Sequence, residues 1–211
     1  MMTKKISYAV LMAGMLLISC GKKNQEDNNA AAPVAQGDQK LKPIADSLKV
    51  DWTAYKTTDK VPVKGHFTSI KLEKVSEGNS IEDIMNSAEF SINSMELATG
   101  NDGRDEKLKK SFFGLMDEPG VIKGKLNFND NQWTVSLTMN GVTVDNVPAQ
   151  VEIKDQKFTL NTTIKLEDFK AIKVLNALNE ICHDLHKGPD GISKTWDVVD
   201  VSATEVFEGV E

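Results

Sequence analysis

Residues 132–153, QWTVSLTMNGVTVDNVPAQVEI, alternate apolar and polar side chains on both sides of the pair Asn140-Gly141. A period of two places successive side chains on opposite faces of a β-strand. Trp133, Val135 and Leu137 therefore share one face. The Asn-Gly pair favours a two-residue turn because both residue types tolerate a positive φ. The stretch predicts a β-hairpin that buries one face against a core.

The same alternation continues through most of the chain and predicts an all-β fold. Short turns, such as the one between Phe128 and Trp133, favour antiparallel neighbours. About eight such strands close naturally into an up-and-down barrel that can hold one small ligand, and a two-sheet sandwich is the alternative. The apolar parity changes after Phe67, which predicts a bulge or bend near Ser69. Besides the hairpin, the alternating segments are 48–57, 61–72, 88–97, 121–129, 157–166 and 195–207.

Two segments follow a helical period and are expected to cover the barrel. In residues 101–116, Asp102 is the expected N-cap of an amphipathic helix. Its apolar side comprises Leu108, Phe112, Leu115 and Met116. Residues 169–188 form the second predicted helix, which Gly188-Pro189 stops. Its apolar stripe comprises Val174, Leu175, Leu178, Ile181, Cys182 and Leu185.

Many large apolar side chains fall on the inward parity of the predicted strands. Gly65 and Gly124 share that parity, and space is expected beside them. The periodicity leaves open whether these side chains fill a solid core or line a cavity for a long apolar ligand. The candidate lining residues are Trp52, Phe67, Phe90, Ile92, Ile122, Leu126, Phe128, Trp133, Leu137, Phe158 and Leu160.

The first 46 residues are expected to direct export and then to tether the domain. Lys4 and Lys5 precede an apolar run, residues 6–18, which is too short to span a bilayer and is typical of a secretory signal. The stretch LISC that ends at Cys20 resembles a bacterial lipobox, whose cysteine is diacylated after cleavage. The expected organisation is a signal peptide over 1–19, a lipidated Cys20 with a disordered tether over 20–46, and one barrel domain over 47–211.

The stretch CHDLHKG, residues 182–188, concentrates metal-binding and nucleophilic side chains. At 100° per residue, Cys182 falls on the apolar stripe while His183 lies well round the helix. His186 could approach Cys182, but a structural zinc site needs four ligands, and the remaining histidine, His66, lies on a predicted strand. The pattern favours packing at a helix end over a metal site or a redox thiol.

Motifs for catalysis are absent from the sequence. There is no GxSxG elbow, no HExxH and no glycine-rich phosphate loop, so neither an enzyme nor a cofactor or metal is predicted. The formal net charge of −6 is dispersed without a basic patch, which argues against nucleic acid as a partner.

Several stretches together resemble the YceI-like family of exported lipid-binding proteins. The most specific are Arg104 and Asp105 followed by Leu108 and Phe112-Phe113, and the hairpin around Leu137-Thr138 and Gly141-Val142-Thr143. The resemblance implies an eight-stranded lipocalin-like barrel that holds a polyisoprenoid or similar amphiphile, with helix covering one end. The residues assigned to this lid are Arg104, Leu108, Phe112 and Phe113.

The sequence thus predicts a carrier or reservoir for a polyisoprenoid or quinone-like lipid, attached to a membrane of the cell envelope through Cys20, on the periplasmic face or at the outer membrane. The polar end of the ligand is expected near the helical lid, where Arg104 either contacts it or forms a surface salt bridge. The alternative is a non-enzymatic interaction module with a solid barrel. Either form could act as a monomer or a homodimer.

Overall fold

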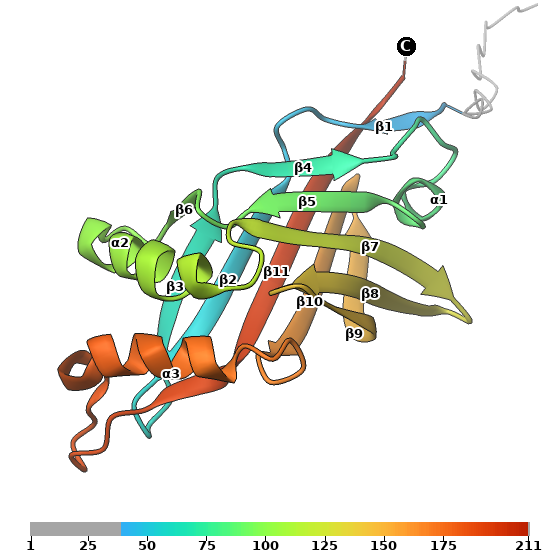
Figure 1. Ribbon diagram of the computed structural model, residues 1–211. Coiled ribbons are helices and arrows are strands. Elements are labelled where there is room, and N and C mark those ends of the chain that lie inside the picture. Colours follow the sequence, from blue (N-terminus) through green and yellow to red (C-terminus); the bar gives the residue numbers. More distant parts are fainter. Residues whose placement is uncertain (1–38, 211) are drawn as a thin grey trace, which may run out of the picture. The chain divides into compact units, whose positions relative to one another are not determined.

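The computed structural model describes residues 39–210, which form antiparallel strands curled into a half-barrel with few helices (Figure 1). The predicted all-β fold is confirmed, whereas the predicted signal peptide and lipidated Cys20 lie outside the described residues. The elements are β1 (Leu41–Pro43), β2 (Lys49–Lys56), β3 (Val61–Phe67), β4 (Ile70–Glu73), α1 (Ile81–Met85), β5 (Glu89–Asn93), β6 (Leu97–Ala98), α2 (Asp102–Ser111), the 3-10 helix η1 (Phe113–Leu115), β7 (Val121–Asn129), β8 (Gln132–Met139), β9 (Val142–Lys154), β10 (Lys157–Lys165), α3 (Ile172–Ile181), the 3-10 helix η2 (His183–His186) and β11 (Thr195–Gly209).

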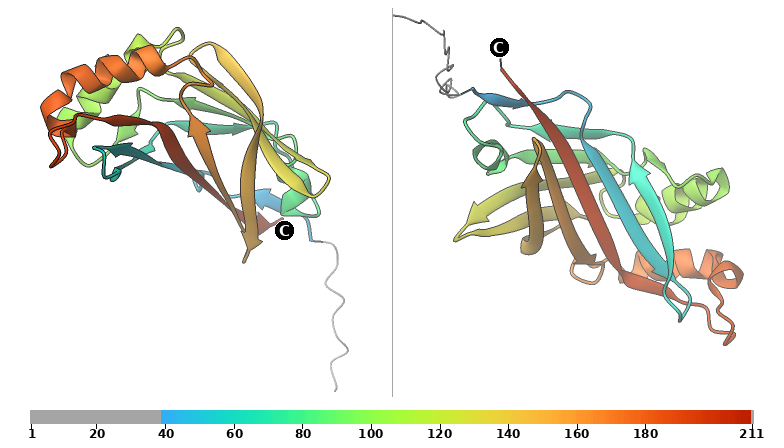
Figure 2. Two further views of the ribbon diagram at one scale, coloured as in Figure 1. Left: turned by 90° about the horizontal axis from the view of Figure 1, so that it is seen from below. Right: turned by 180° about the vertical axis from the view of Figure 1, so that it is seen from behind.

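The sheet order is β4-β5-β7-β8-β9-β10-β11-β2-β3-β6, and β1 pairs with β11. Only Thr68 and Ser69 separate β3 from β4, and a short turn separates β5 from β6, so each couple is one interrupted strand. Counted in this way, eight strands line the half-barrel, as predicted. The pairing of β9 with β10 stops at Gln150 and Asn161, and the wall splays apart beyond that point. Figure 2 shows β4, β5, β7 and β8 running across the direction of β2, β3 and β11.

The bend predicted near Ser69 is the corner between these two directions. Phe67 pairs with Leu97, while Ile70 pairs with Ile92. Between these two pairs the chain advances by three residues on the β3–β4 side and by five residues on the β5–β6 side. The two extra residues form a bulge, which bends both strands.

The two inward glycines do not leave empty space, which corrects the expectation from the sequence. Gly65 pairs with Trp52, and Gly124 pairs with Phe90. A Cβ added to Gly65 would lie 2.2 Å from Cζ2 of Trp52, and one added to Gly124 would lie 2.3 Å from Cζ of Phe90. Each aromatic ring therefore covers the glycine of the neighbouring strand instead of projecting into the lumen.

The Asn140-Gly141 hairpin has the predicted geometry and a second role. Both residues have a positive φ, 53° and 68°. The Asn140 side chain is buried: its Oδ1 accepts a hydrogen bond from the Asp117 N–H at 2.8 Å, and its Nδ2 donates to the Phe169 carbonyl oxygen at 2.9 Å. Asp117 follows α2 and η1, and Phe169 precedes α3. The hairpin therefore fixes one end of each covering helix.

Helices α2 and α3 lie side by side at one end of the curled sheet (Figure 1). Asn101, not the predicted Asp102, is the N-cap of α2, because its Oδ1 accepts from the Arg104 N–H at 2.8 Å. Leu115 was predicted to face the core but is 53% exposed, since the α-helix ends before it and η1 turns it outward.

The predicted stripe of the second helix is correct only in part. Val174, Leu175, Leu178 and Cys182 are buried, whereas Ile181 and Leu185 are 56% and 57% exposed. The α-helix ends at Ile181, and the tighter winding of η2 rotates Leu185 out of the stripe.

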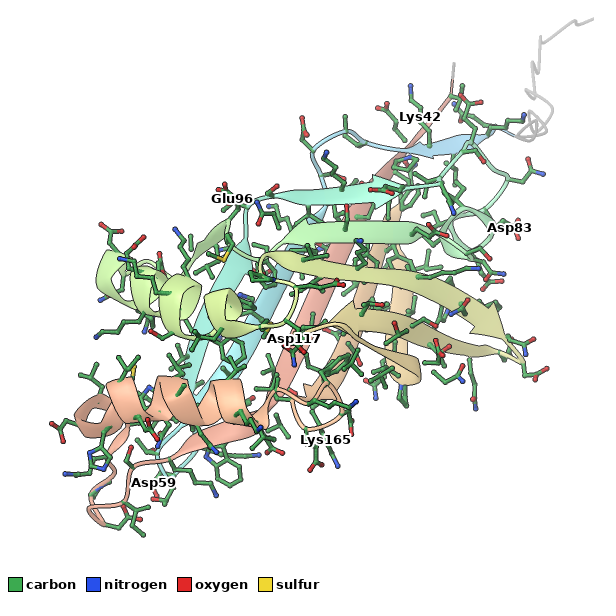
Figure 3. All side chains as sticks on the ribbon, in the orientation of Figure 1. Lys42, Asp59, Asp83, Glu96, Asp117 and Lys165 are labelled. Carbon is green, nitrogen blue, oxygen red and sulfur yellow. The ribbon has the colours of Figure 1, made fainter. Side chains whose placement is uncertain are left out.

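The predicted tether also ends earlier than expected. Leu41, Lys42 and Pro43 form β1 and pair with Gly209, Glu208 and Phe207 of β11, so the structured domain begins before Ser47. Charged side chains such as Lys42, Asp83 and Lys165 project from the periphery (Figure 3). Within residues 39–210, no helix combines the length and apolar character needed to cross a bilayer.

The packing of Phe90 on Gly124 predicts that Gly124→Ala lowers the free energy of unfolding by about 2 kcal/mol, because the new methyl group would overlap the ring. The methyl group would also lie 2.8 Å from the Ser136 carbonyl oxygen, which cannot move aside easily. Urea denaturation measures the change. Gly103→Ala in α2 is the control, since its nearest neighbour would be 3.5 Å away. An equal loss of unfolding free energy in both variants would contradict the packing of Phe90 on Gly124.

The double hydrogen bonding of Asn140 predicts that Asn140→Gly costs about 2 kcal/mol, since glycine retains the positive φ but loses both bonds. Asn131→Gly is the matched control, because Asn131 also has a positive φ (62°) in the exposed β7–β8 turn. We expect the control to change stability by less than about 0.5 kcal/mol. Thermal unfolding of the two variants distinguishes a side-chain role from a turn preference.

Candidate functional site

An apolar cavity of about 180 Å³ occupies the lumen of the curled sheet. The side chains that line it come from every long strand and from α2 and α3. Only Thr162, Thr195 and Thr204 among them are polar. Such a lining offers a ligand dispersion contacts and exclusion from water but few hydrogen bonds. The lumen is therefore suited to an apolar chain.

The cavity is lined because successive side chains of each strand point to opposite faces of the sheet. On β2, Val50, Trp52 and Ala54 face the cavity, while Asp51 and Thr53 face outward. On β11, the same alternation directs Val199, Val201 and Ala203 toward the cavity. The sequence did not predict them as lining residues, although their alternation is that of an inward face.

Most of the predicted lining and lid residues meet at this cavity. They are Trp52, Phe67, Phe90, Ile92, Ile122, Leu126, Leu137, Phe158, Leu160, Leu108, Phe112 and Phe113. Two predicted lining residues, Phe128 and Trp133, do not line it. Their rings lie 4.9 Å apart, and Trp133 contacts Phe158 edge-on at 5.4 Å. These aromatic rings fill one end of the lumen as solid packing.

Both helices contribute to the cover of the cavity. Phe113 contacts Phe67 at a centroid distance of 5.9 Å and Phe112 at 5.0 Å, with edge-on geometry in both cases. Leu175 and Leu178 of α3 also line the cavity. The helical period marked them as buried, but it could not show that they reach the lumen, because that depends on where α3 docks.

A second cavity of about 330 Å³ adjoins the first at the helical end. Trp52, Ala54, Leu108, Leu178 and Thr195 line both. We call this second cavity the mouth. Its remaining lining residues are Tyr55, Lys56, Val63, Asn101, Gly103, Arg104, Lys107, Cys182, Leu185 and His186.

The predicted lid residue Arg104 lines the mouth and not the apolar cavity. Its Nε donates to Thr99 Oγ1 at 2.8 Å, and its Nη2 donates to the Thr99 carbonyl oxygen at 3.0 Å. Thr99 also donates from its backbone N–H to Asp105 at 3.1 Å. The guanidinium group is thus held in place by a neutral residue.

The stretch CHDLHKG divides between packing and the mouth. Cys182 is buried, and burial raises the pKa of its thiol. Burial lowers the pKa of His186 to about 4, and the positive charges of Lys56 and Lys107 act in the same direction. His183 is exposed beside Asp184. In the described part of the chain, no cluster of three or more histidine, cysteine or acidic side chains could hold a metal ion.

One buried donor in this region has no acceptor. The Trp52 Nε1–H makes no hydrogen bond with any of residues 39–210. Trp52 stands at the junction of the two cavities. An unsatisfied buried N–H costs free energy.

Three solved structures are similar to this chain, and the first of them shares its fold. A polyisoprenoid-binding domain from Saccharophagus degradans, implicated in plant cell wall breakdown, has a TM-score of 0.57 at 14% identity, over 82% of this chain and 99% of that chain. BcnA from Burkholderia cenocepacia has a TM-score of 0.47 at 16% identity, over 79% and 99%. A YceI protein from Campylobacter jejuni has a TM-score of 0.40 at 21% identity, over 71% and 85%.

Comparison at the level of sequence gives the family. No curated protein matches the chain. The family model of the YceI-like domain, however, matches residues 40–204, which include every residue that lines the lumen. The curled antiparallel sheet, its apolar cavity and this match agree with the resemblance carried by Arg104, Phe112 and the Asn140-Gly141 hairpin. The chain belongs to the YceI-like family.

Proposed function

We propose that this protein binds a long apolar lipid, such as a polyisoprenoid, in its lumen and acts as a carrier or reservoir without catalysing a reaction. The observation that carries the proposal is the continuous apolar lining of the cavity, broken only by three threonines. The polyisoprenoid-binding domain from S. degradans, which shares the fold, supports the choice of ligand.

The energetics favour a chain-like ligand. Each methylene that leaves water for apolar surroundings contributes about 0.8 kcal/mol. A lipid leaves a bilayer only if the protein offers an equivalent apolar environment, and the lumen offers aromatic and aliphatic side chains on all sides. The open cavity also favours a container over the solid interaction module that the sequence left as an alternative.

We further propose that the domain is anchored in the cell envelope through a lipidated Cys20. The support is the basic and apolar segment over residues 4–18 and the LISC stretch, since two acyl chains anchor stably where one does not. Eighteen residues, 21–38, separate Cys20 from the described domain. Such a segment spans at most about 60 Å, so the domain could work at some distance from its membrane.

The proposed lipid binding predicts that protein produced without residues 1–20 takes up an isoprenoid in a one-to-one complex. We expect native mass spectrometry to show a mass increment equal to the added lipid, or to a co-purified one that solvent extraction removes. A chain that neither retains nor takes up any of several isoprenoids of different length would refute the proposed function.

A substitution that fills the lumen should block uptake. Ala203 lines the cavity on β11, so Ala203→Phe places a ring in the space of the ligand. We expect the variant to lose most isoprenoid binding, at least about tenfold, because overpacking leaves no room for the chain. Ser202→Phe, on the outward face of the same strand, is the control and should bind as the unmodified protein does. Melting temperatures of both variants separate lost binding from lost folding.

A further inference from the structure

We propose that the mouth binds an acidic head group, so that the ligand is a long-chain amphiphile ending in a carboxylate or a phosphate. This inference rests on the proposed function, since it assigns the polar end of a ligand whose chain lies in the lumen. Its starting point is the charge of the mouth: Lys56, Arg104 and Lys107 line it, and no acidic side chain does.

This concentration of positive charge stands out in a chain with a formal net charge of −6. The lysines that form ion pairs in the described residues all lie outside the mouth, as Lys110 does beside Glu106 at 3.2 Å. Among residues 39–210, none of the three mouth cations makes an ion pair within 4.0 Å. Lys56 instead donates to the Leu185 carbonyl oxygen at 3.0 Å, and Arg104 bonds only to Thr99. Among the described residues, the three mouth cations therefore have no acidic group in direct contact, and Arg104 reaches Asp105 only through the Thr99 hydroxyl.

The first turn of α2 adds to this field. Asn101 and Gly103 line the mouth, so the positive end of a ten-residue helix faces it. The two acidic residues of that turn reduce this field but do not line the mouth. Asp105 is buried and bonded to Thr99, and Asp102 is exposed outside the mouth. Helix N-termini with nearby cations are well suited to carboxylates and phosphates.

Two titratable groups of the mouth respond to the same charges. The positive charges of Lys56 and Lys107 help to lower the pKa of His186, and they oppose the burial that raises the pKa of Cys182. His186 Nδ1 lies 2.7 Å from Thr195 Oγ1, whose hydrogen is directed to Asn179 at 2.8 Å. Nδ1 is therefore the donor in this pair, which orients the neutral ring.

The position of the mouth favours an amphiphile over a free anion. Trp52, Leu108 and Leu178 line both cavities, so a chain in the lumen would bring its end group directly among the cations. A neutral head group would leave the cations partly desolvated without compensation, which costs free energy. An acidic head group provides the missing counterion.

The test compares ligands that differ only at the head. The first pair, hexadecanoate and hexadecan-1-ol, tests a carboxylate, and the second pair, geranylgeranyl phosphate and geranylgeraniol, tests a phosphate. The dissociation constant of each ligand is measured by Trp fluorescence at pH 7.5 and low salt. We expect the acid to bind about tenfold more tightly than the alcohol in at least one pair, and the preference to shrink at high salt. The pair that shows it identifies the head group.

The matched variants are Lys56→Gln/Lys107→Gln and Lys49→Gln/Lys110→Gln, which remove the same charge from the same strand and helix. Lys49 and Lys110 are exposed and lie outside the mouth. The first variant should lose most of the preference for the acid while binding the alcohol as before, and the second should keep the preference. Equal binding of acid and alcohol by the unmodified protein, or equal losses in both variants, would overturn the inference and leave lipid binding intact. Failure to bind any of the four ligands would overturn this inference, whereas the proposed function is refuted only if isoprenoids of other lengths are not bound either.

Discussion

The lumen depends on two contacts in which an aromatic ring covers a glycine on the neighbouring strand. Trp52 lies over Gly65 and Phe90 over Gly124, so each ring packs on backbone where a side chain would otherwise stand. A ring directed at the centre would fill the space that it now borders. The same residues thus supply apolar area and preserve the volume between them, which is why a barrel with so many large side chains retains a cavity.

The site combines two environments with different physical chemistry. The lumen excludes water and offers almost no hydrogen bonds, so it contributes affinity in proportion to the buried length of a ligand. The mouth offers charge, which contributes less affinity in water but distinguishes one head group from another. Leu108 and Leu178 line both cavities, so in the proposed complex a single molecule would lie across the boundary between them.

Much of the wall could be predicted from the sequence, because strand parity is a local property. The alternation around Trp133 and Leu137 and the change of parity after Phe67 both correspond to observed features. The predictions from the sequence fail where the burial of a residue depends on contacts with distant parts of the chain. Leu185 left its stripe because the helix tightened after Cys182, and the space at Gly124 is filled from a different strand. Of the charged residues of the mouth, the sequence indicated only Arg104, since Lys56, Lys107 and His186 come from three separate segments in a chain with 25 lysine and arginine residues.

Asn140 has a mechanical consequence for the covering helices. It holds the segment after α2 and the turn before α3 at one point, while the opposite ends of both helices border the mouth. A ten-residue helix is about 15 Å long, so a rotation of about 20° around the fixed end moves the free end by about 5 Å. Both helices are therefore tied to the sheet by this one side chain, at the ends that lie away from the mouth. In the proposed complex, a lipid with its tail in the lumen and its head group in the mouth would enter tail first and leave head first.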